Sequence, residues 1–138
     1  MEFKLHPERK FRHIISVPFI YMMIIPVIIM DFFIEIYHHI CFPLYGIPIV
    51  KRSNYIRMDR QKLEYLSFRE KINCAYCGYV NGFATYFLRI ANDTEKYWCG
   101  IKHKKQEGFI EQAHQKNFLE YGDEKAYCNL VGEERRKK

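Results

Sequence analysis

Apolar residues are concentrated near the N-terminus, in an uncharged stretch long enough to cross a membrane. Residues 14–30 read IISVPFIYMMIIPVIIM. A helix of about 20 residues spans the ~30 Å hydrocarbon core of a bilayer, and it tolerates lipid because it pairs its own backbone groups. We expect Pro18 to lie near its first turn and Pro26 to bend it. The pattern therefore predicts a transmembrane helix over residues 14–34, after a basic flank at residues 1–13.

Three other structures are compatible with parts of this pattern. A cleaved signal peptide would explain the basic residues before the stretch, but cleavage needs small residues, and the first alanine of the chain is Ala75. The core helix of a soluble protein would need more apolar residues around it than the rest of the chain supplies. A re-entrant hairpin over residues 14–50, with both ends on one side of the membrane, remains open.

Residues 35–58 mix apolar, aromatic and titratable side chains, which suits an interfacial segment at the lipid headgroups. The motif FPLYGIP at residues 42–48 predicts an extended segment, because proline interrupts a helix. Asp31 and Glu35 are expected where the helix leaves lipid, and a His-His pair follows them. If these side chains face a protein interior instead, they become candidates for handling protons or ions.

The second half of the chain predicts a small helical domain over residues 59–130. Its clearest element is an amphipathic helix over residues 80–97, where apolar residues recur at i, i+3, i+4, i+7 and i+8. Weaker patterns predict helices over residues 59–72 and 109–121, and the basic tail at residues 131–138 is expected to fray. The predicted fold class is mainly α, with one N-terminal transmembrane helix and a small helical soluble domain that a metal ion holds together.

The net charge of +6 resides in residues 51–138, because the four basic and four acidic residues before them cancel. Basic residues beside an anchor favour anionic lipid headgroups, at about 1 kcal/mol each. They are mixed with acidic residues rather than gathered in a stripe, so no nucleic-acid partner is expected. The distribution of basic residues and the ease of keeping thiols reduced both favour the cytosol. We therefore predict a single-pass protein of the cell membrane with a cytoplasmic C-terminal domain.

Cysteine and histidine side chains form two local pairs. The string NCAYCGY holds Cys74 and Cys77, whose sulfurs can reach one ion from a tight turn, and YWCGIKH adds Cys99 and His103. A helical hairpin between the pairs would bring them together. Four such ligands suit tetrahedral zinc or, less often, iron. The sequence predicts a metal site at these four residues, with Cys128 as the alternative fourth ligand.

Residues 74–79, CAYCGY, resemble the first metal-binding knuckle of rubredoxin and the related zinc ribbons, which share the pattern C-x2-C-G-Y. Gly78 is expected to let the backbone curl so that amides approach the sulfurs. The second C-x2-C of that family is replaced here by C-x3-H, which argues against rubredoxin-like electron transfer. Together, HHICFPLYGIP, NCAYCGYVNG and YWCGIKH resemble a family of small, uncharacterised bacterial membrane proteins, a likeness that implies no particular activity.

Other interpretations of these side chains stay open. The cysteines can be reduced thiols packed beside aromatic rings, or the C-x2-C pair can be a redox dithiol just before a helix N-terminus. The E-x2-H sequences at Glu35–His38 and Glu111–His114 match the spacing of di-iron carboxylate proteins, with Asp31 and Glu70 as further carboxylates.

Motifs of nucleotide-binding enzymes, serine hydrolases and zinc proteases are absent from the sequence. Enzymatic activity is left open and is not favoured. We expect a membrane-anchored, metal-binding protein, with zinc preferred, that acts as a binding or assembly module. Its partners would be the lipid bilayer and another membrane protein. The alternative is a membrane-bound iron redox protein, either rubredoxin-like or di-iron.

Overall fold

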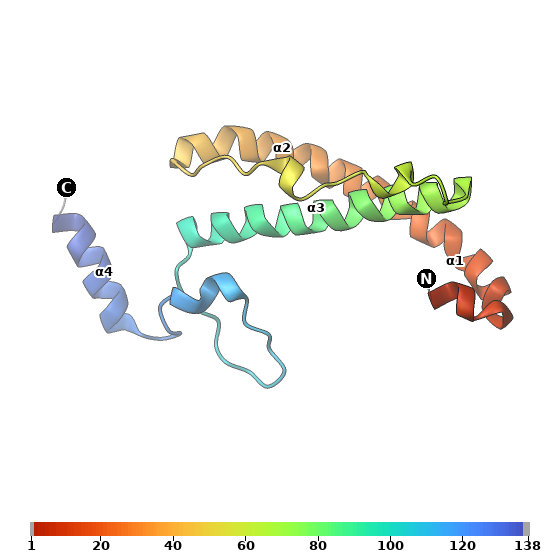
Figure 1. Cartoon of the computed structure of the whole chain (residues 1–138). Coiled ribbons are helices and arrows are strands. Elements are labelled where there is room, and N and C mark those ends of the chain that lie inside the picture. The colour runs from red at the N-terminus through yellow and green to blue at the C-terminus, as the bar shows by residue number, and fades with distance from the viewer. Residues whose placement is uncertain (1, 137–138) are drawn as a thin grey trace. The chain divides into compact units, whose positions relative to one another are not determined.

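The computed structural model of the chain describes residues 2–136 and the side chains of residues 4–132. Helices account for 71% of the chain and the described residues form no strand, so the predicted mainly α class is confirmed. The α-helices of this part are α1 (Lys10–Met22), α2 (Ile24–Tyr45), α3 (Phe68–Trp98) and α4 (Glu124–Arg136) (Figure 1). The chain divides within α3 into unit 1 (Met1–Leu88) and unit 2 (Arg89–Lys138).

α1 and α2 form one helical stretch, Pro7–Tyr45, that is long and apolar enough to cross a membrane by length and composition. Its most apolar window is 6% buried, whereas the core helix of a soluble protein is mostly buried. The helix is interrupted at Met23, because Pro26 has no N–H for the carbonyl group of Met22. The expected effect of Pro26 is thus observed, but Pro18 lies inside α1 rather than in its first turn.

α2 continues through Pro43 and ends before Gly46, so the extended segment predicted from residue 42 begins too early. Gly46 has a φ of 71°, and the N–H of Ile47 donates to the carbonyl of Phe42 at 2.9 Å, as in a Schellman cap. Phe42 is fully buried. The burial of this ring and the glycine cap outweigh the single backbone donor that Pro43 lacks.

Residues 47–67 form a strap that runs back along α2 before α3 begins. The N–H of Val50 donates to Nε2 of His38 at 2.9 Å, and Nη1 of Arg52 lies 2.5 Å from Oδ1 of Asp31. Because the strap returns the chain to its starting end, α3 runs parallel to α2 within unit 1 (Figure 1). Hydrogen bonds link α3 to both N-terminal helices. Tyr21 of α1 pairs with Asn73, and in α2 Asp31 pairs with Tyr79 and His38 with Tyr86.

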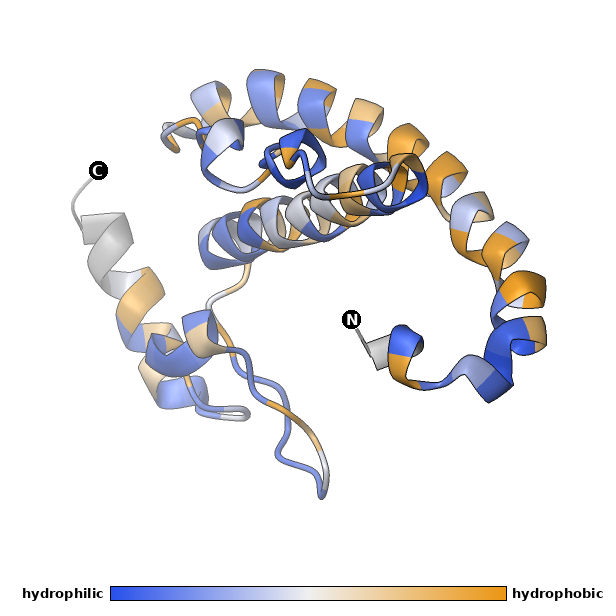
Figure 2. Cartoon of the chain, turned by 45° about the vertical axis from the view of Figure 1, so that its right-hand side comes forward, coloured by the Kyte–Doolittle hydropathy of each residue, from blue (hydrophilic) through white to orange (hydrophobic). Residues whose placement is uncertain are grey.

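The two faces of α2 have the reverse of the polarity that is usual in water. Its inward face, against the strap and α3, buries Asp31 and His38, which are 8% and 0% exposed. Its outward face exposes Phe32, Phe33 and Leu44, at 62%, 62% and 77%. Apolar exposure continues along α1, and Figure 2 shows hydrophobic residues along both helices and hydrophilic ones along the strap. A helix in water buries its apolar stripe and exposes its charges.

Two glycines let the strap lie directly against the backbone of α3. A Cβ on Gly78 would stand 2.9 Å from the carbonyl oxygen of Arg57, and one on Gly82 would stand 2.8 Å from that of Tyr55. Both distances are shorter than a Cβ tolerates, so the close approach requires glycine. Gly78 lies inside α3 and serves this contact. The tight turn that the sequence predicts around it is not formed.

α3 is one helix where the sequence predicts two, over residues 59–72 and 80–97. The N–H and hydroxyl of Ser67 both donate to the Glu70 carboxylate, at 2.9 and 2.7 Å, which matches one half of a capping box and marks the helix start. Hydrogen bonding from Lys4, and then from Ser67, lowers the pKa of Glu70 to about 2. The residues before Ser67 belong to the strap, because its contacts with α3 outweigh their local helical pattern.

Unit 2 contains the end of α3, a long loop and α4. The loop closes through backbone bonds in which Leu119 donates to Gly100 at 2.7 Å and Lys102 donates to Leu119 at 2.8 Å. In place of the helix predicted over residues 109–121, the chain makes a short 3-10 turn at Ala113–Asn117. The backbone of Leu119, near the end of that segment, pairs with Gly100 and Lys102 instead of continuing a helix. These hydrogen bonds outweigh the local helical pattern.

The end of the chain is more helical than expected. Gly122 has a φ of 82° and precedes α4, which reaches Arg136. The tail predicted to fray at residues 131–138 is therefore helical as far as the structure describes it, and residues 137–138 lie outside the described residues.

Candidate functional site

Six polar side chains from α2, the strap and α3 meet inside unit 1. The Asp31–Arg52 cluster consists of Asp31, Glu35, His38, Arg52, Tyr79 and Tyr86. The α2 members recur every three or four residues and so share one helical face. The sequence analysis identified these but missed Arg52 and the two tyrosines. A signal for Arg52 was present in the sequence. An arginine follows soon after an apolar helix with two acidic residues, and buried carboxylates need a cation.

Arg52 neutralises the acidic side chains of the cluster. Its Nη1 and Nη2 lie 2.5 and 2.6 Å from the two carboxylate oxygens of Asp31, which is bidentate pairing. Nη1 also lies 2.9 Å from Oε1 of Glu35. The Tyr79 hydroxyl donates to Oδ2 of Asp31 at 2.7 Å. The carboxylate of Asp31 is thus fully hydrogen-bonded within the protein, as a buried charge requires.

The hydrogen bonds of His38 determine its tautomer. Its Nε2 accepts the N–H of Val50 at 2.9 Å, so in the neutral ring Nδ1 carries the proton and donates to the Tyr86 hydroxyl, also at 2.9 Å. His38 is fully buried, and both of its nitrogens are occupied. The ring therefore connects the strap to α3 through α2.

Arg52 and the two tyrosines of the cluster keep fixed charge states near neutral pH. Hydrogen bonding to Asp31 raises the pKa of Arg52, against the opposing effect of burial. Burial, and then the hydrogen bond to Asp31, raises the pKa of Tyr79 to about 12. Burial also raises the pKa of Tyr86, with a further contribution from Glu35. These three groups act near pH 7 as one fixed cation and two hydrogen-bonding hydroxyls.

Glu35, His38 and His39 form the one group of three metal-ligating side chains, among the described residues, whose ligand atoms all lie within 4.8 Å of one another. Their donor atoms already have partners. Arg52 binds Glu35, both nitrogens of His38 are bonded, and Nδ1 of His39 lies 2.9 Å from the Glu35 carbonyl oxygen. A metal ion would have to displace a cation and at least two hydrogen bonds, so these residues fit an internal network better than a metal site.

The predicted sulfur and imidazole ligands are divided between the two units. Cys74 and Cys77 lie within α3 in unit 1, whereas Cys99 and His103 follow α3 in unit 2. Cys74 is half-buried, and Cys77, Cys99 and the alternative ligand Cys128 are exposed. The described residues do not place these ligand atoms in a group within 4.8 Å of one another. The site at these residues stays a prediction.

The redox-dithiol interpretation loses its physical argument. It required the C-x2-C pair just before a helix N-terminus, where the helix dipole lowers a thiol pKa. The pair lies inside α3, which begins at Phe68.

The two E-x2-H pairs also lie in different units. Glu35–His38 belongs to the Asp31–Arg52 cluster, whereas Glu111 pairs with Lys102 at 3.4 Å and His114 pairs with Glu95 at 2.5 Å. Each side chain that a di-iron centre would need thus has a local protein partner.

Glu95 joins the loop of unit 2 to the last turns of α3. Its carboxylate accepts Nε2–H of His114 at 2.5 Å and Nε2–H of Gln115 at 2.7 Å. Burial acts to raise the pKa of Glu95, but these hydrogen bonds outweigh it and hold the pKa below its usual range.

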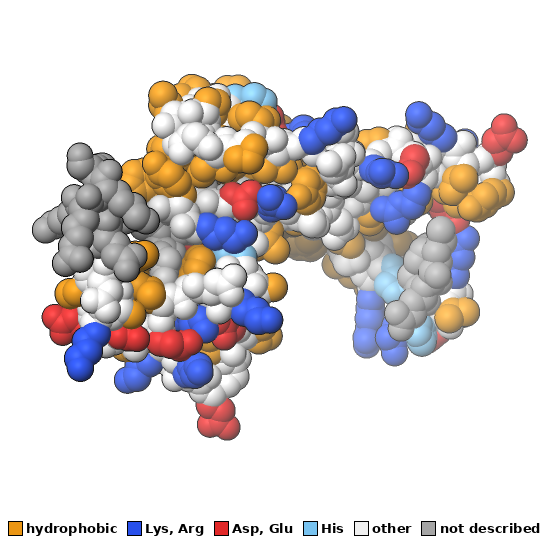
Figure 3. Space-filling view, turned by 60° about the vertical axis from the view of Figure 1, so that its left-hand side comes forward, with side chains coloured by type: hydrophobic (Ala, Val, Ile, Leu, Met, Phe, Trp, Pro, Cys, Tyr) orange, Lys and Arg blue, Asp and Glu red, His pale blue; other side chains and the backbone are white. Residues whose placement is uncertain are grey.

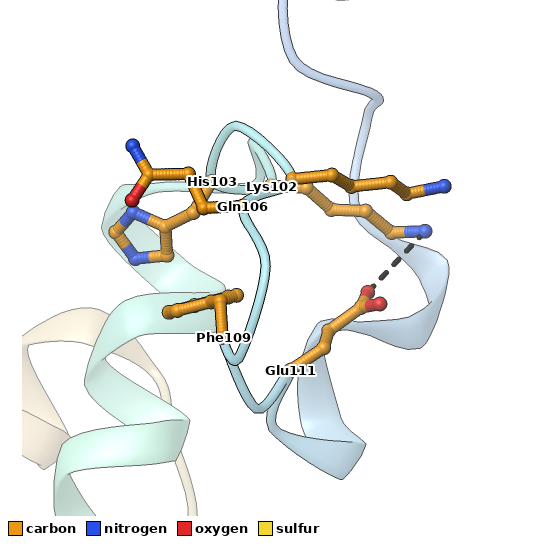
Figure 4. A pocket seen from close by; sticks show the side chains of 6 residues that line it. Lys102, His103, Gln106, Phe109 and Glu111 are labelled. Carbon is orange, nitrogen blue, oxygen red and sulfur yellow. Dashed lines mark ion pairs between the residues drawn. The ribbon is translucent and has the colours of Figure 1, made fainter.

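The same loop surrounds an open pocket of about 290 Å³ (Figure 4). Lys102 and His103 come from its first half, and Phe109 and Glu111 from its second. Lys102 and Glu111 form an ion pair at 3.4 Å, and the rings of His103 and Phe109 have centroids 5.4 Å apart. The lining holds two lysines, Lys102 and Lys105, and one acidic residue, Glu111, and we assign this pocket no ligand.

Comparison with protein-family models, with curated proteins and with solved structures finds no match to the chain.

Proposed function

We propose that the chain is a membrane-anchored protein that acts as a binding or assembly module at the membrane surface. The observation that supports this is the reversed polarity of α2, which buries Asp31 and His38 and exposes Phe32 and Phe33. In lipid the exposed apolar surface regains about 25 cal/mol for each Å² removed from water. The inward charges remain satisfied, because Arg52 pairs with them inside the protein.

The packing of unit 1 favours one-sided attachment. The strap and α3 lie beside α1 and α2 between His38 and Tyr21. If α1 and α2 crossed the bilayer, the strap and α3 would therefore enter the hydrocarbon core as well. The exposed strap residues Arg57, Asp59 and Arg60 would each cost about 2.5–3.5 kcal/mol at the bilayer centre. Irregular backbone exposed to lipid is also unfavourable.

We therefore place α1 and α2 along one face of the bilayer, with the apolar side chains in the acyl region and the strap in water. Both chain ends then lie on the same side, which we take to be cytoplasmic because the chain has five free cysteines. This arrangement replaces the single-pass helix in the proposal and keeps the one-sided topology that a re-entrant hairpin shares.

The water-facing surface is the part that a membrane protein partner would meet. Figure 3 shows charged side chains of both signs over the residues of unit 2 and hydrophobic patches over the end of α2. A mixed charged surface with a net positive chain suits a position beside anionic headgroups.

Carbonate extraction tests the anchor. We expect the wild-type chain to stay in the membrane pellet and the double variant Phe32→Asp/Phe33→Asp to move to the supernatant, because two charges then face lipid. The control is Tyr65→Asp, which changes an 80% exposed aromatic residue of the strap. Release of the wild type, or equal release of the control, would contradict the proposal.

Labelling with an impermeant maleimide tests the topology. Leu5 is 76% exposed and Cys128 is exposed, so Leu5→Cys and the native Cys128 report the two ends of the chain when peptide mass spectrometry distinguishes them from the exposed Cys77 and Cys99. We expect both sites to be labelled from the same side of sealed vesicles. Labelling from opposite sides would establish the single-pass arrangement instead.

Metal analysis tests the remaining part of the proposal, a zinc site at Cys74, Cys77, Cys99 and His103. Bound zinc without visible absorption, lost together with thermal stability in Cys77→Ala, is the expected result. Iron with a thiolate-to-metal band would favour the redox alternative. Unchanged metal content in Cys77→Ala would contradict its role as a ligand.

A further inference from the structure

A groove of about 580 Å³ lies between α1 and the first half of α3 in unit 1. This volume is within the range of small-ligand pockets, about 300–1,000 Å³. Its wall is mainly apolar, with Ile14, Val17 and Ile20 contributed by α1. The exposed cations Lys10 and Arg69 belong to the same lining, one from each helix.

Contacts at both ends of the groove fix α3 against α1 and against the N-terminal 3-10 turn at Glu2–Leu5. At one end the Tyr76 hydroxyl donates to the carbonyl of Ile20 at 2.7 Å, and the Tyr21 and Tyr76 rings meet edge to face. At the other end Lys4 pairs with Glu70 at 2.5 Å. Between these ends the hydroxyl of Ser16 donates to the carbonyl of His13 in its own helix. It therefore needs no acceptor from a ligand in the groove.

We infer that this groove binds one anionic phospholipid, with an acyl chain between α1 and α3 and the phosphate between Lys10 and Arg69. The apolar wall matches a hydrocarbon chain, and the two cations complement a phosphate. A second copy of the chain would bring the same cations to a symmetric interface, where they repel. The inference rests on the proposed function, because the lipid comes from the leaflet against which α1 lies.

Titration of the full chain in neutral detergent tests this, with bound lipid counted by native mass spectrometry. We expect saturable binding of phosphatidylglycerol and markedly weaker binding of phosphatidylcholine. Lys10→Gln/Arg69→Gln should weaken phosphatidylglycerol binding about 25-fold, at about fivefold for each cation. The control Lys51→Gln/Lys62→Gln removes the same charge from the strap and should change binding by less than about twofold.

A second variant separates the groove from general attraction to anionic lipid. Val17→Phe fills the groove without changing charge, and Val17 is 45% exposed, so the fold has room for the larger side chain. We expect this variant to lose the bound lipid while it remains in carbonate-washed membranes.

Four results would overturn the inference. They are equal binding of the two lipids, equal loss of binding in the strap control, the absence of a saturable lipid site, and a lipid-free dimer that Val17→Phe dissociates. The last would make a second copy the occupant. A chain that stays in carbonate-washed membranes but shows no saturable lipid site contradicts this inference alone, whereas a chain that carbonate releases contradicts the proposed function.

Discussion

Unit 1 and unit 2 each bury both apolar and polar side chains, and they differ in how their large apolar side chains are exposed. Unit 1 buries Asp31 and His38 while the large apolar side chains of α1 and α2 face outward. In unit 2, the described residues that are fully buried are Ile90 and Gln115, and charged side chains lie on the surface. The first pattern suits lipid on one face, and the second suits water.

Each unit also depends on one charged side chain that several others share. In unit 1 this is Arg52, and the Asp31 carboxylate it binds is fully paired. In unit 2 it is Glu95. Among the described residues, two buried atoms of unit 2 have no hydrogen-bond partner, Nδ1 of His114 and Oε1 of Gln115, and unit 1 has one such atom, Oε1 of Gln61. Each such atom costs about 1–3 kcal/mol. We therefore expect unit 2 to open before unit 1.

The largest expected effect comes from Arg52→Gln. This substitution should destabilise unit 1 and so remove its advantage in stability over unit 2. It leaves two carboxylates without their cation. Breaking a fully buried ion pair costs about 3–5 kcal/mol, and we expect about 2–4 kcal/mol here because the pair is partly exposed. Thermal unfolding in detergent measures the loss. Arg57→Gln, an exposed arginine of the same strap, is the control, and equal losses in the two variants would contradict the assigned role.

The next largest effects come from two glycine substitutions, which should change the stability of the two units in opposite directions. Gly82→Ala should destabilise unit 1 by about 1–3 kcal/mol, because its Cβ would meet the Tyr55 carbonyl oxygen at 2.8 Å. Gly132→Ala in α4 has nothing within 4 Å of the added Cβ and should stabilise its helix by about 0.5–1 kcal/mol. Denaturant titration of both variants checks the opposite signs. A neutral Gly82→Ala would mean that the strap does not lie against α3.

The smallest effect is confined to unit 2. Glu95→Gln should release the 3-10 turn at Ala113–Asn117 at a cost of about 1 kcal/mol, since neutral hydrogen bonds replace charge-assisted ones. Hydrogen exchange should accelerate there and remain unchanged at the strap.

The same contact gives a pH dependence. The pKa of Glu95 is lowered in the folded chain, so the stabilisation is complete above the usual glutamate pKa near 4.3 and is lost as pH falls through the folded pKa. Wild-type exchange at the turn should accelerate in acid, and Glu95→Gln should abolish that dependence. Acid acceleration of equal size in the variant would contradict the assignment to Glu95.

Sequence reasoning succeeded where the evidence is local. The uncharged run at residues 14–30 and the apolar spacing of residues 80–97 each predicted a helix that the structure contains. It failed at glycine and at closed loops. Gly78 was interpreted as a turn signal, although its missing side chain serves a contact with Arg57. The helix predicted over residues 109–121 gave way to a loop that closes on its own backbone.

For the same reason, only half of the Asp31–Arg52 cluster could be predicted from the sequence. Its acidic residues and His38 share one helix and one period, which local pattern shows. Their partners are distant in the chain: Arg52 is 21 positions from Asp31, and Tyr79 is 48 positions from it. No local signal links residues that far apart.

Length and hydrophobicity were therefore enough to establish an apolar helix near the N-terminus and a mainly helical chain, because both follow from neighbouring residues. Which way α2 faces was decided by packing. Once the strap and the parallel α3 supply Arg52, Tyr79 and the Val50 N–H, the lowest free energy places charges inward and hydrocarbon outward. That outcome leaves the large apolar side chains of α2 exposed, although the composition of the helix would also suit a protein core.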